Sequence, residues 1–535
     1  MKNGAENRHD RTNDIMGDIG KYRSHIFLVG LFVFLLHGAK LNSNVIGIDT
    51  EDLIHLGRDF YGGWLATGRQ GLVFLKYFLG NSYFEPYFAG AMTLIMFTLA
   101  AAAFFLLWDR VGGRSGETKR GLAAWGLGGL LWVSHPILVE QFYFSLQSME
   151  ICLCFVLTAA SLYLSFLWVE NRRRREHIFQ LIAVTALLFI VFSSYQIFVV
   201  LYIFGVITIL LLQSLTALGR DAAVPAVELW KKAGVYAVLF LTAFVLDMAV
   251  TGIFFSTSDY LQQQIMWGEG AFSDNIRNIL HHIRQVLTGA DSIFYHWTYG
   301  LLCAASFLLL LLALRKHRRQ RKGNLLMIVF LYLAAMVMPF LMTVVIGGIP
   351  VVRSQLILPV MTGFLAYLNV ILLQQTTFPG EKAALSAAVV LILICGAGSL
   401  EQARMTGALY YTDRCRYEQD VAIARQLIRK LQVVNRWNLP VAVVGSLEFE
   451  PNNACVQGEI IGRSFFDYDT EVEPLNYWST RRVLGFFHIL GADYEQLHAD
   501  RMEEALTHST YMAMWPEDNC IEMCDDFAVI KLSDF

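Results

Sequence analysis

The sequence predicts an all-α polytopic membrane protein with about eleven transmembrane helices, followed by a small C-terminal α/β domain. Hydrophobic residues make up 55% of the 535 residues and charged residues only 16%. The apolar residues form long runs between short charged clusters, which is typical of a bilayer protein. A helix needs roughly 20 apolar residues to cross the hydrocarbon core. Runs near that length cover residues 24–43, 84–108, 121–139, 147–168, 178–193, 196–214, 233–254, 298–314, 325–348, 355–374 and 383–400.

The distribution of basic residues predicts the orientation. The first run follows a polar stretch of 23 residues without a small-residue cleavage site, which indicates a retained span and not a signal peptide. With a cytoplasmic N-terminus, the inner segments hold 23 Lys and Arg and the outer loops hold six. Because Lys and Arg are enriched in cytoplasmic loops, we expect a multi-pass plasma-membrane protein with its N-terminus inside. The clusters at 172–175 and 315–322 are then topology anchors.

This topology divides the chain into three parts. Residues 1–23 form a cytoplasmic N-terminal segment, residues 24–400 the transmembrane domain with outer loops 44–83 and 255–297, and residues 401–535 an extracytoplasmic α/β domain. In that last part, apolar spacing predicts a helix over 413–434, and strands are expected at 440–445 and 527–532. Neither a nucleophile motif nor a phosphate loop follows the first strand, so we expect a structural or acceptor-recognising domain.

The tail also holds four of the eight cysteines, Cys415, Cys455, Cys520 and Cys524. In an oxidising compartment these four could form disulfides, although their spacing does not read as a zinc site. The net charge of -3 is too small to indicate a charged partner, and a role in nucleic-acid binding is not expected.

The first outer loop concentrates polar chemistry. It carries the acids Asp49, Glu51 and Asp52, then Arg58, Trp64 and Arg69. Ionisable groups at a membrane surface inside a protein cost free energy, so they tend to be paired and to mark a site. The interleaved aromatic residues and glycines favour an interfacial pocket over a loose connector.

Three other outer segments could converge on this loop. They carry Glu140 and Gln141 between the third and fourth spans, Tyr195 and Gln196 between the fifth and sixth, and Arg353 between the ninth and tenth. A guanidinium group suits a phosphate because it can donate two parallel hydrogen bonds. The loop 255–297 contains a predicted helix over 275–286 with His281 and His282, which we interpret as an interfacial helix and not a metal site.

The order of these motifs resembles the bacterial glucosyltransferase GtrII family. The resemblance rests on the acidic cluster after the first span and on the residues that follow it, Arg58, Gly62-Gly63, Trp64 and Gly68-Arg69. It rests also on the later Tyr195-Gln196 and on Gly462-Arg-Ser-Phe-Phe466 in the tail. Where the family pattern has an adjacent Asp-Asp pair, this chain has Asp49-Thr-Glu51-Asp52, which leaves open the acid that takes the catalytic place. Members of the family are polytopic membrane glycosyltransferases of the GT-C type, so the resemblance implies a GT-C-like transmembrane domain.

The resemblance implies a hexosyltransferase that moves glucose from a polyprenyl-phosphate sugar to a cell-surface glycan on the outer face of the membrane, with inversion. Asp49 is the first choice for the general base, with Glu51 or Asp52 positioning the acceptor, binding a cation or exchanging roles with it. The phosphate would lie against Arg58, Arg69 or Arg353. Substrate contacts are expected from Trp64, Glu140, Gln141, Tyr195 and Gln196. No cofactor is required by the sequence, although a divalent cation, Mg²⁺ or Mn²⁺, would be compatible with the acids.

Two other classes of function share these features. An O-antigen-type polysaccharide polymerase would have similar spans and an outer pocket, and would differ in its donor. A glycolipid flippase or transporter would place ionisable residues deep inside several spans, where this sequence has few.

Overall fold

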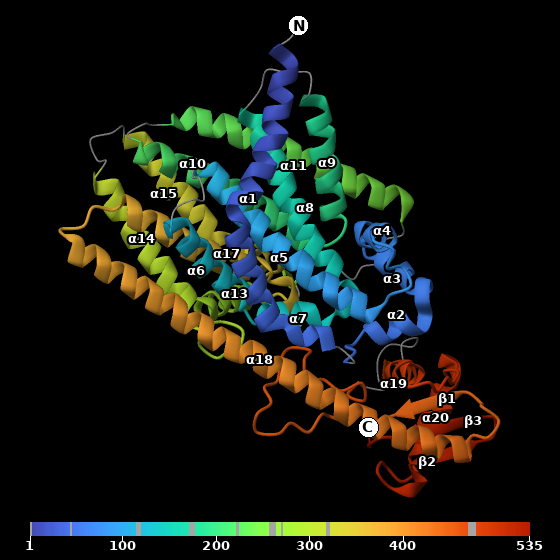
Figure 1. Cartoon of the computed structure of the whole chain (residues 1–535). Helices are drawn as coiled ribbons and strands as arrows, with labels where there is room; N and C mark the ends of the chain where they lie inside the picture. Colours follow the sequence, from blue (N-terminus) through green and yellow to red (C-terminus); the bar gives the residue numbers. More distant parts are fainter. Residues whose placement is uncertain are drawn as a thin grey trace.

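In the computed structural model, long helices form a bundle, and a small α/β domain lies at one end of it (Figure 1). The structure describes residues 3–42, 45–113, 119–170, 177–220, 224–255, 264–268, 271–316, 322–468 and 478–534. The basic cluster at 172–175 and most of the one at 315–322 lie outside these residues, so the structure does not bear on their role as topology anchors.

Long apolar helices dominate the described chain. They are α1 (Asn3–His37), α5 (Pro86–Val111), α8 (Ser145–Glu170), α10 (Ile197–Gly219), α11 (Ala226–Phe254), α14 (Thr298–Lys316), α15 (Lys322–Val337), α17 (Ile357–Gln375) and α18 (Glu381–Val434). Nine stretches in the described residues are long and apolar enough to cross a membrane, and α15 reaches that length together with α16 (Leu341–Ile346). The chain is therefore a multi-pass membrane protein built from helices.

The predicted number of eleven spans is only partly supported. A tenth candidate is a bent pair, α6 (Lys119–Val133) and α7 (Ile137–Tyr143), whose axes differ by 56°. The eleventh predicted span corresponds to α9 (His177–Phe192), whose apolar stretch Ile178–Phe192 is shorter than the roughly 20 residues that a span needs. The count of eleven thus stays a prediction.

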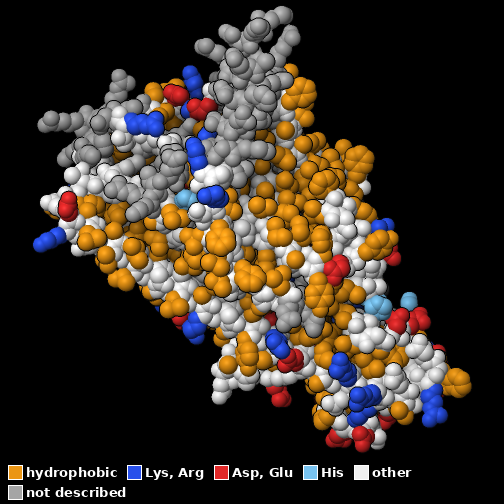
Figure 2. All heavy atoms as spheres, in the orientation of Figure 1, with side chains coloured by type: hydrophobic (Ala, Val, Ile, Leu, Met, Phe, Trp, Pro, Cys, Tyr) orange, Lys and Arg blue, Asp and Glu red, His pale blue; other side chains and the backbone are white. Residues whose placement is uncertain are grey.

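The surface of the bundle is suited to lipid. Hydrophobic side chains spread over its visible face, whereas charged side chains gather on the C-terminal domain and at the opposite end (Figure 2). Large apolar side chains such as Phe34 of α1 and Leu393 of α18 are more than half exposed. In a soluble protein such a broad exposed apolar surface would be a liability, so the bundle is expected to lie in the bilayer.

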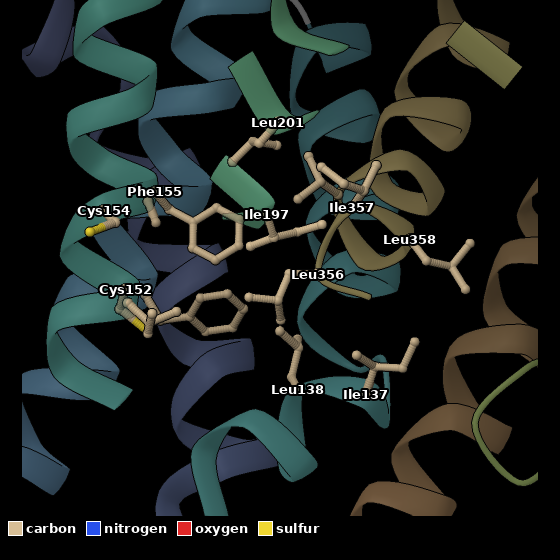
Figure 3. Packing of buried hydrophobic residues seen from close by; sticks show 14 of the residues in the cluster. Ile137, Leu138, Cys152, Cys154, Phe155, Ile197, Leu201, Leu356, Ile357 and Leu358 are labelled. Atoms are coloured by element: carbon tan, nitrogen blue, oxygen red, sulfur yellow. The ribbon is translucent and has the colours of Figure 1, made fainter. Parts of the chain in front are cut away.

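The centre of the bundle is formed around α17, most of whose side chains are buried. Residues of α7, α8, α10 and α17 meet there, among them Leu138, Phe155, Ile197 and Ile357 (Figure 3). The bend between α6 and α7 therefore lies against a closely packed core. Its backbone is stabilised by α18, since Thr406 Oγ1 donates to the Ser134 carbonyl oxygen at 2.9 Å.

The first outer loop folds into short helices, α2 (Thr50–Leu56), α3 (Tyr61–Ala66) and α4 (Gln70–Phe78). Helix α4 lies close to the break between α9 and α10, because the Gly71 amide donates to the Ser193 carbonyl oxygen at 2.9 Å. A Cβ at Gly71 would come within 2.3 Å of the Ile190 carbonyl oxygen, so glycine is needed for this approach. Two polar segments that are far apart in the sequence thus lie side by side.

Helix α18 is continuous from the bundle into the C-terminal domain, so the span expected at 383–400 and the helix expected at 413–434 are one helix of 54 residues. The predicted boundary at residue 401 therefore falls inside a helix. Strands β1 (Val441–Val444) and β3 (Phe527–Lys531) confirm the two expected strands, and β2 (Ile521–Cys524) is an additional one. The sheet order is β1-β3-β2, with β1 parallel and β2 antiparallel to β3.

Helices α19 (Trp478–Ile489) and α20 (Met502–Ser509) pack on this sheet. The four cysteines of the tail, including Cys415 and Cys455, are free thiols in this structure.

Candidate active site

The acidic segment is placed by contacts around the start of α2. The Ile48 amide donates to the Tyr143 hydroxyl oxygen at 3.1 Å, and Arg416 Nη2 of α18 donates to the Ile46 carbonyl oxygen at 3.1 Å. A Cβ on Gly47 would lie 2.8 Å from the Tyr143 carbonyl oxygen, so only glycine allows the chain to pass here. The segment is held by α7 and α18 before the acids begin.

Asp49 precedes α2 in a left-handed backbone conformation, with φ 69°. Asp and Asn adopt this conformation more readily than most other residues. The turn directs the following acids of α2 inward: the Glu51 side chain is fully buried and that of Asp52 is 4% exposed, whereas that of Asp49 is 38% exposed. The three acids are thus close in sequence but differ in access to solvent.

Two arginines of α19 meet these acids, and the sequence analysis did not single them out. Arg482 Nη2 lies 2.6 Å from Asp49 Oδ1, and its Nη1 contacts Glu51 Oε1 and lies 3.4 Å from Asp52 Oδ2. Arg481 binds Asp52 with two nitrogens, Nε at 3.1 Å from Oδ1 and Nη2 at 2.9 Å from Oδ2. The C-terminal domain therefore supplies the positive charge that the acidic segment needs.

The charges of this cluster do not balance when every group is ionised, because three carboxylates face two guanidinium groups. Burial raises the pKa of Glu51 to about 8. The positive charge of Arg482 lowers this pKa, and the negative charges of Asp52 and Asp49 raise it further. Burial alone would lower the pKa of Arg482, but the three acids raise it well above its usual range. At neutral pH we therefore expect a proton on Glu51 and a permanent charge on Arg482.

The approach of α2 to α19 depends on a glycine. A Cβ on Gly485 would lie 3.3 Å from Glu51 Cγ, so a larger side chain there would push the helices apart. The Arg482 guanidinium also lies 5.3 Å from the ring centroid of Trp478 and 5.4 Å from that of Tyr468. Aromatic rings attract cations at this range, so they add to the hold on Arg482.

The arginines predicted to bind the phosphate form no ion pair with this acidic cluster in the described residues, and each has its own set of neighbours. Arg58 Nη2 donates to Ser82 Oγ at 3.1 Å, and its guanidinium stacks 3.9 Å from the ring centroid of Tyr83. Arg69 lies 5.2 Å from the ring centroid of Tyr195. Within the described part of the chain, neither Arg58 nor Arg69 forms an ion pair with a carboxylate. Arg353 differs, since it lies beside Glu459 and 4.7 Å from the Phe144 ring centroid.

The predicted substrate-binding residues have mostly internal contacts. Trp64 is buried and stacks on Tyr61, with centroids 5.6 Å apart. Glu140 accepts hydrogen bonds from the Glu459 amide at 2.7 Å and the Ile460 amide at 3.3 Å, so it anchors the tail to α7.

The other residues predicted to bind substrate make few polar contacts within the protein. Both polar atoms of the buried Gln141 side chain are without a hydrogen-bond partner among the described residues. Tyr195 is buried beneath Arg69, and Gln196 is half-buried at the start of α10. The contacts of Arg69 and Tyr195 confirm that the first outer loop meets the α9–α10 break.

Two further polar features were missed by the sequence analysis. Lys76 of α4 and Glu150 of α8 form a fully buried ion pair, with Nζ 2.9 Å from Oε1. A cavity of about 490 Å³ lies beside the α6–α7 bend and is lined by residues that include Pro136, His296 and Glu401. The acids Asp49, Glu51 and Asp52 do not line it.

The acids fit a divalent cation poorly while the arginines are bound to them. A hard cation such as Mg²⁺ needs several free oxygen ligands, but Oδ1 of Asp49, Oε1 of Glu51 and both carboxylate oxygens of Asp52 already accept from guanidinium groups. The predicted cation therefore gains no support from this cluster.

The comparison with known families decides between the enzyme classes. Residues 38–370 match the family described as Glucosyl transferase GtrII. The chain belongs to the GtrII glucosyl transferase family. The matched region runs from the end of α1 to α17, so it includes the acidic segment, Arg58, Arg69 and Arg353 of this chain.

The family membership makes the chain a glucosyltransferase, as the resemblance of its motifs predicted. The tail with Arg481 and Arg482 lies beyond the matched region. Neither a curated protein nor a solved structure matches the chain.

Proposed function

We propose that this GtrII member transfers glucose from a polyprenyl-phosphate sugar to a cell-surface glycan on the outer face of the membrane, with Asp49 as the general base. The observation that carries the choice of base is the exposure of the acids. The Asp49 side chain is 38% exposed, whereas those of Glu51 and Asp52 are buried against Arg481 and Arg482. A base must reach the acceptor hydroxyl, and Asp49 has that access.

The proposed reaction breaks the bond between the anomeric carbon and the phosphate oxygen. The acceptor hydroxyl gives its proton to Asp49 and its oxygen attacks the anomeric carbon from the face opposite the phosphate, which inverts the configuration. The donor is a phosphodiester with one negative charge, and the released polyprenyl phosphate is a monoester with two. A guanidinium group near the leaving oxygen would therefore stabilise charge that grows in the transition state.

Arg58 and Arg69 are better placed for this role than Arg353. Within the described residues they contact hydroxyl groups and aromatic rings but no carboxylate, so their charge is available to a phosphate. Arg353 lies beside Glu459, which offsets part of its charge. Arg482 then acts as a positioning residue, since it binds Oδ1 of Asp49.

The test uses the purified full-length protein in lipid nanodiscs with a radiolabelled polyprenyl-phosphate glucose and isolated cell-surface glycans. Asp49→Asn keeps the shape and the left-handed backbone, so we expect kcat to fall by roughly 10²- to 10⁴-fold, the contribution of a general base. Asp525→Asn is the matched control, because Asp525 also has a positive φ, 45°, and lies in the turn between β2 and β3.

Arg58→Gln and Arg69→Gln should each weaken donor use more than Arg353→Gln does. Transfer by Asp49→Asn within a fewfold of the Asp525→Asn rate would refute the assignment of the base. In sealed proteoliposomes, movement of the labelled lipid across the bilayer without transfer would instead support a flippase, and transfer of whole oligosaccharide units would support a polymerase.

A further inference from the structure

The contact between α2 and α19 continues beyond the acids to a pair of histidines. On α2, His55 follows Asp52 by three residues, and on α19, His488 follows Arg481 by seven, so each histidine lies on the same face as the charged residue before it. The two imidazole rings stack with centroids 4.7 Å apart and an angle of 25° between their planes. The side chains are 31% and 33% exposed, at the edge of the domain contact.

A turn after α19 brings the carboxylate of Asp493 close to the two histidines. The Gly491 amide donates to the His488 carbonyl oxygen and the Ala492 amide to the Phe487 carbonyl oxygen, both at 3.0 Å, and Gly491 has φ 85°. This pattern of bonds is a Schellman motif, which reverses the chain at a helix end. As a result Asp493 Oδ1 lies 3.1 Å from His488 Nδ1 and 3.9 Å from His55 Nε2.

These three groups form a compact set of metal donors. One donor atom from each residue lies within 4.8 Å of the other two. In a tetrahedral zinc site the ligand atoms lie about 2.0–2.2 Å from the ion, which places them about 3.3–3.5 Å from one another. To bind an ion the donor atoms here would move closer by up to about 1.5 Å, and the two imidazoles would turn out of their stacked arrangement. Two imidazoles and one carboxylate also suit zinc better than the oxygen-preferring Mg²⁺.

We propose that His55, His488 and Asp493 bind a divalent transition-metal ion of the zinc type, which ties α2 to α19. The Asp493 side chain is 74% exposed, so water can complete the coordination. The site lies one helical turn from Asp52, and it would fix the register in which Arg481 and Arg482 meet the acids. It holds two segments together and does not depend on the proposed reaction, because its ligands are separate from the three acids.

The experiment measures metal binding by the full-length protein in detergent after removal of bound metal with a chelator. Zn²⁺ is titrated against a chromophoric competitor, and the bound metal is counted by mass spectrometry. We expect His55→Ala and His488→Ala each to lose one equivalent of Zn²⁺ or to weaken its binding at least tenfold. The control is His498→Ala, because His498 also contacts a carboxylate, Asp500 at 2.7 Å, but lies outside any such three-residue group in the described chain.

Further measurements distinguish the loss of metal binding from misfolding of a variant. Co²⁺ substituted at the site should give the visible absorption of a tetrahedral ion, and the milder Asp493→Asn should shift or remove that band. Zn²⁺ should also raise the thermal unfolding midpoint of the wild type and of His498→Ala, but not that of His488→Ala. Equal Zn²⁺ stoichiometry and affinity in all variants, or an absorption spectrum unchanged by Asp493→Asn, would overturn the proposal. The proposed function is tested by transfer, so either proposal can fail without the other.

Discussion

Replacing Arg482 with Gln tests whether the C-terminal domain holds the acidic segment in place. Arg482 is 7% exposed and contacts all three acids of the cluster, so its loss leaves Glu51 and Asp52 buried with Arg481 alone. Removing one partner of a buried ion pair costs about 3–5 kcal/mol. Every 1.4 kcal/mol is a factor of about ten in an equilibrium constant, so local opening of α2 should become roughly 10²- to 4 × 10³-fold more frequent.

Hydrogen exchange measured by mass spectrometry on peptides that cover α2 reads this opening directly. The control is Arg501→Gln in the same domain, where Arg501 pairs with Glu504 and Asp526 at an exposed site and only a small change in the exchange of α2 is expected. Protection of α2 in Arg482→Gln equal to that in the Arg501→Gln control would refute this reasoning.

Two further predictions concern buried charges. Because burial raises the pKa of Glu51 to about 8, the folded state holds this proton more tightly than the unfolded chain; the stability that Glu51 contributes is full below about pH 4.5 and is lost as the pH rises through 8. Glu51→Gln should therefore flatten the fall in the thermal unfolding midpoint between pH 5 and 8, and an unchanged slope would contradict the shifted pKa. Lys76→Met should lower the midpoint strongly because it leaves Glu150 buried without its partner, at a cost of about 3–5 kcal/mol, whereas Lys76→Met with Glu150→Leu should recover most of it. Arg404→Met, at the exposed pair with Glu401, is the control, and an equal effect there would contradict the prediction.

The helices of the bundle could be located from the sequence because each spanning helix satisfies its backbone hydrogen bonds internally. Such a helix therefore needs only sufficient length and an apolar composition. The predicted runs therefore fall on helices such as α5, α10 and α17. The bend between α6 and α7 was less predictable, because an apolar run does not reveal a 56° change of direction. The continuity of α18 was missed for a related reason: the polar residues after 400 suggested a boundary, whereas a helix can pass from lipid to water without interruption.

The site was predictable only in part. The acids and Arg58 and Arg69 were recognised because they are concentrated in one outer loop between apolar spans. In the structure Arg69 lies over the ring of Tyr195, so two loops that are far apart in the sequence are in contact. Arg481 and Arg482 follow Asp52 by more than 400 residues, and an arginine doublet in a tail helix is common enough to carry no signal by itself.

Hydropathy and local motifs were enough to predict a multi-pass membrane glucosyltransferase with an acidic loop after its first span, because both depend on residues that are neighbours in the chain. Which acid is exposed and which are buried became apparent only in the folded chain. That distinction depends on α19 docking against α2, where Gly485 permits close approach and Arg482 binds all three acids. The burial of a carboxylate is set by what packs on it, and the residues that pack here come from the other end of the chain.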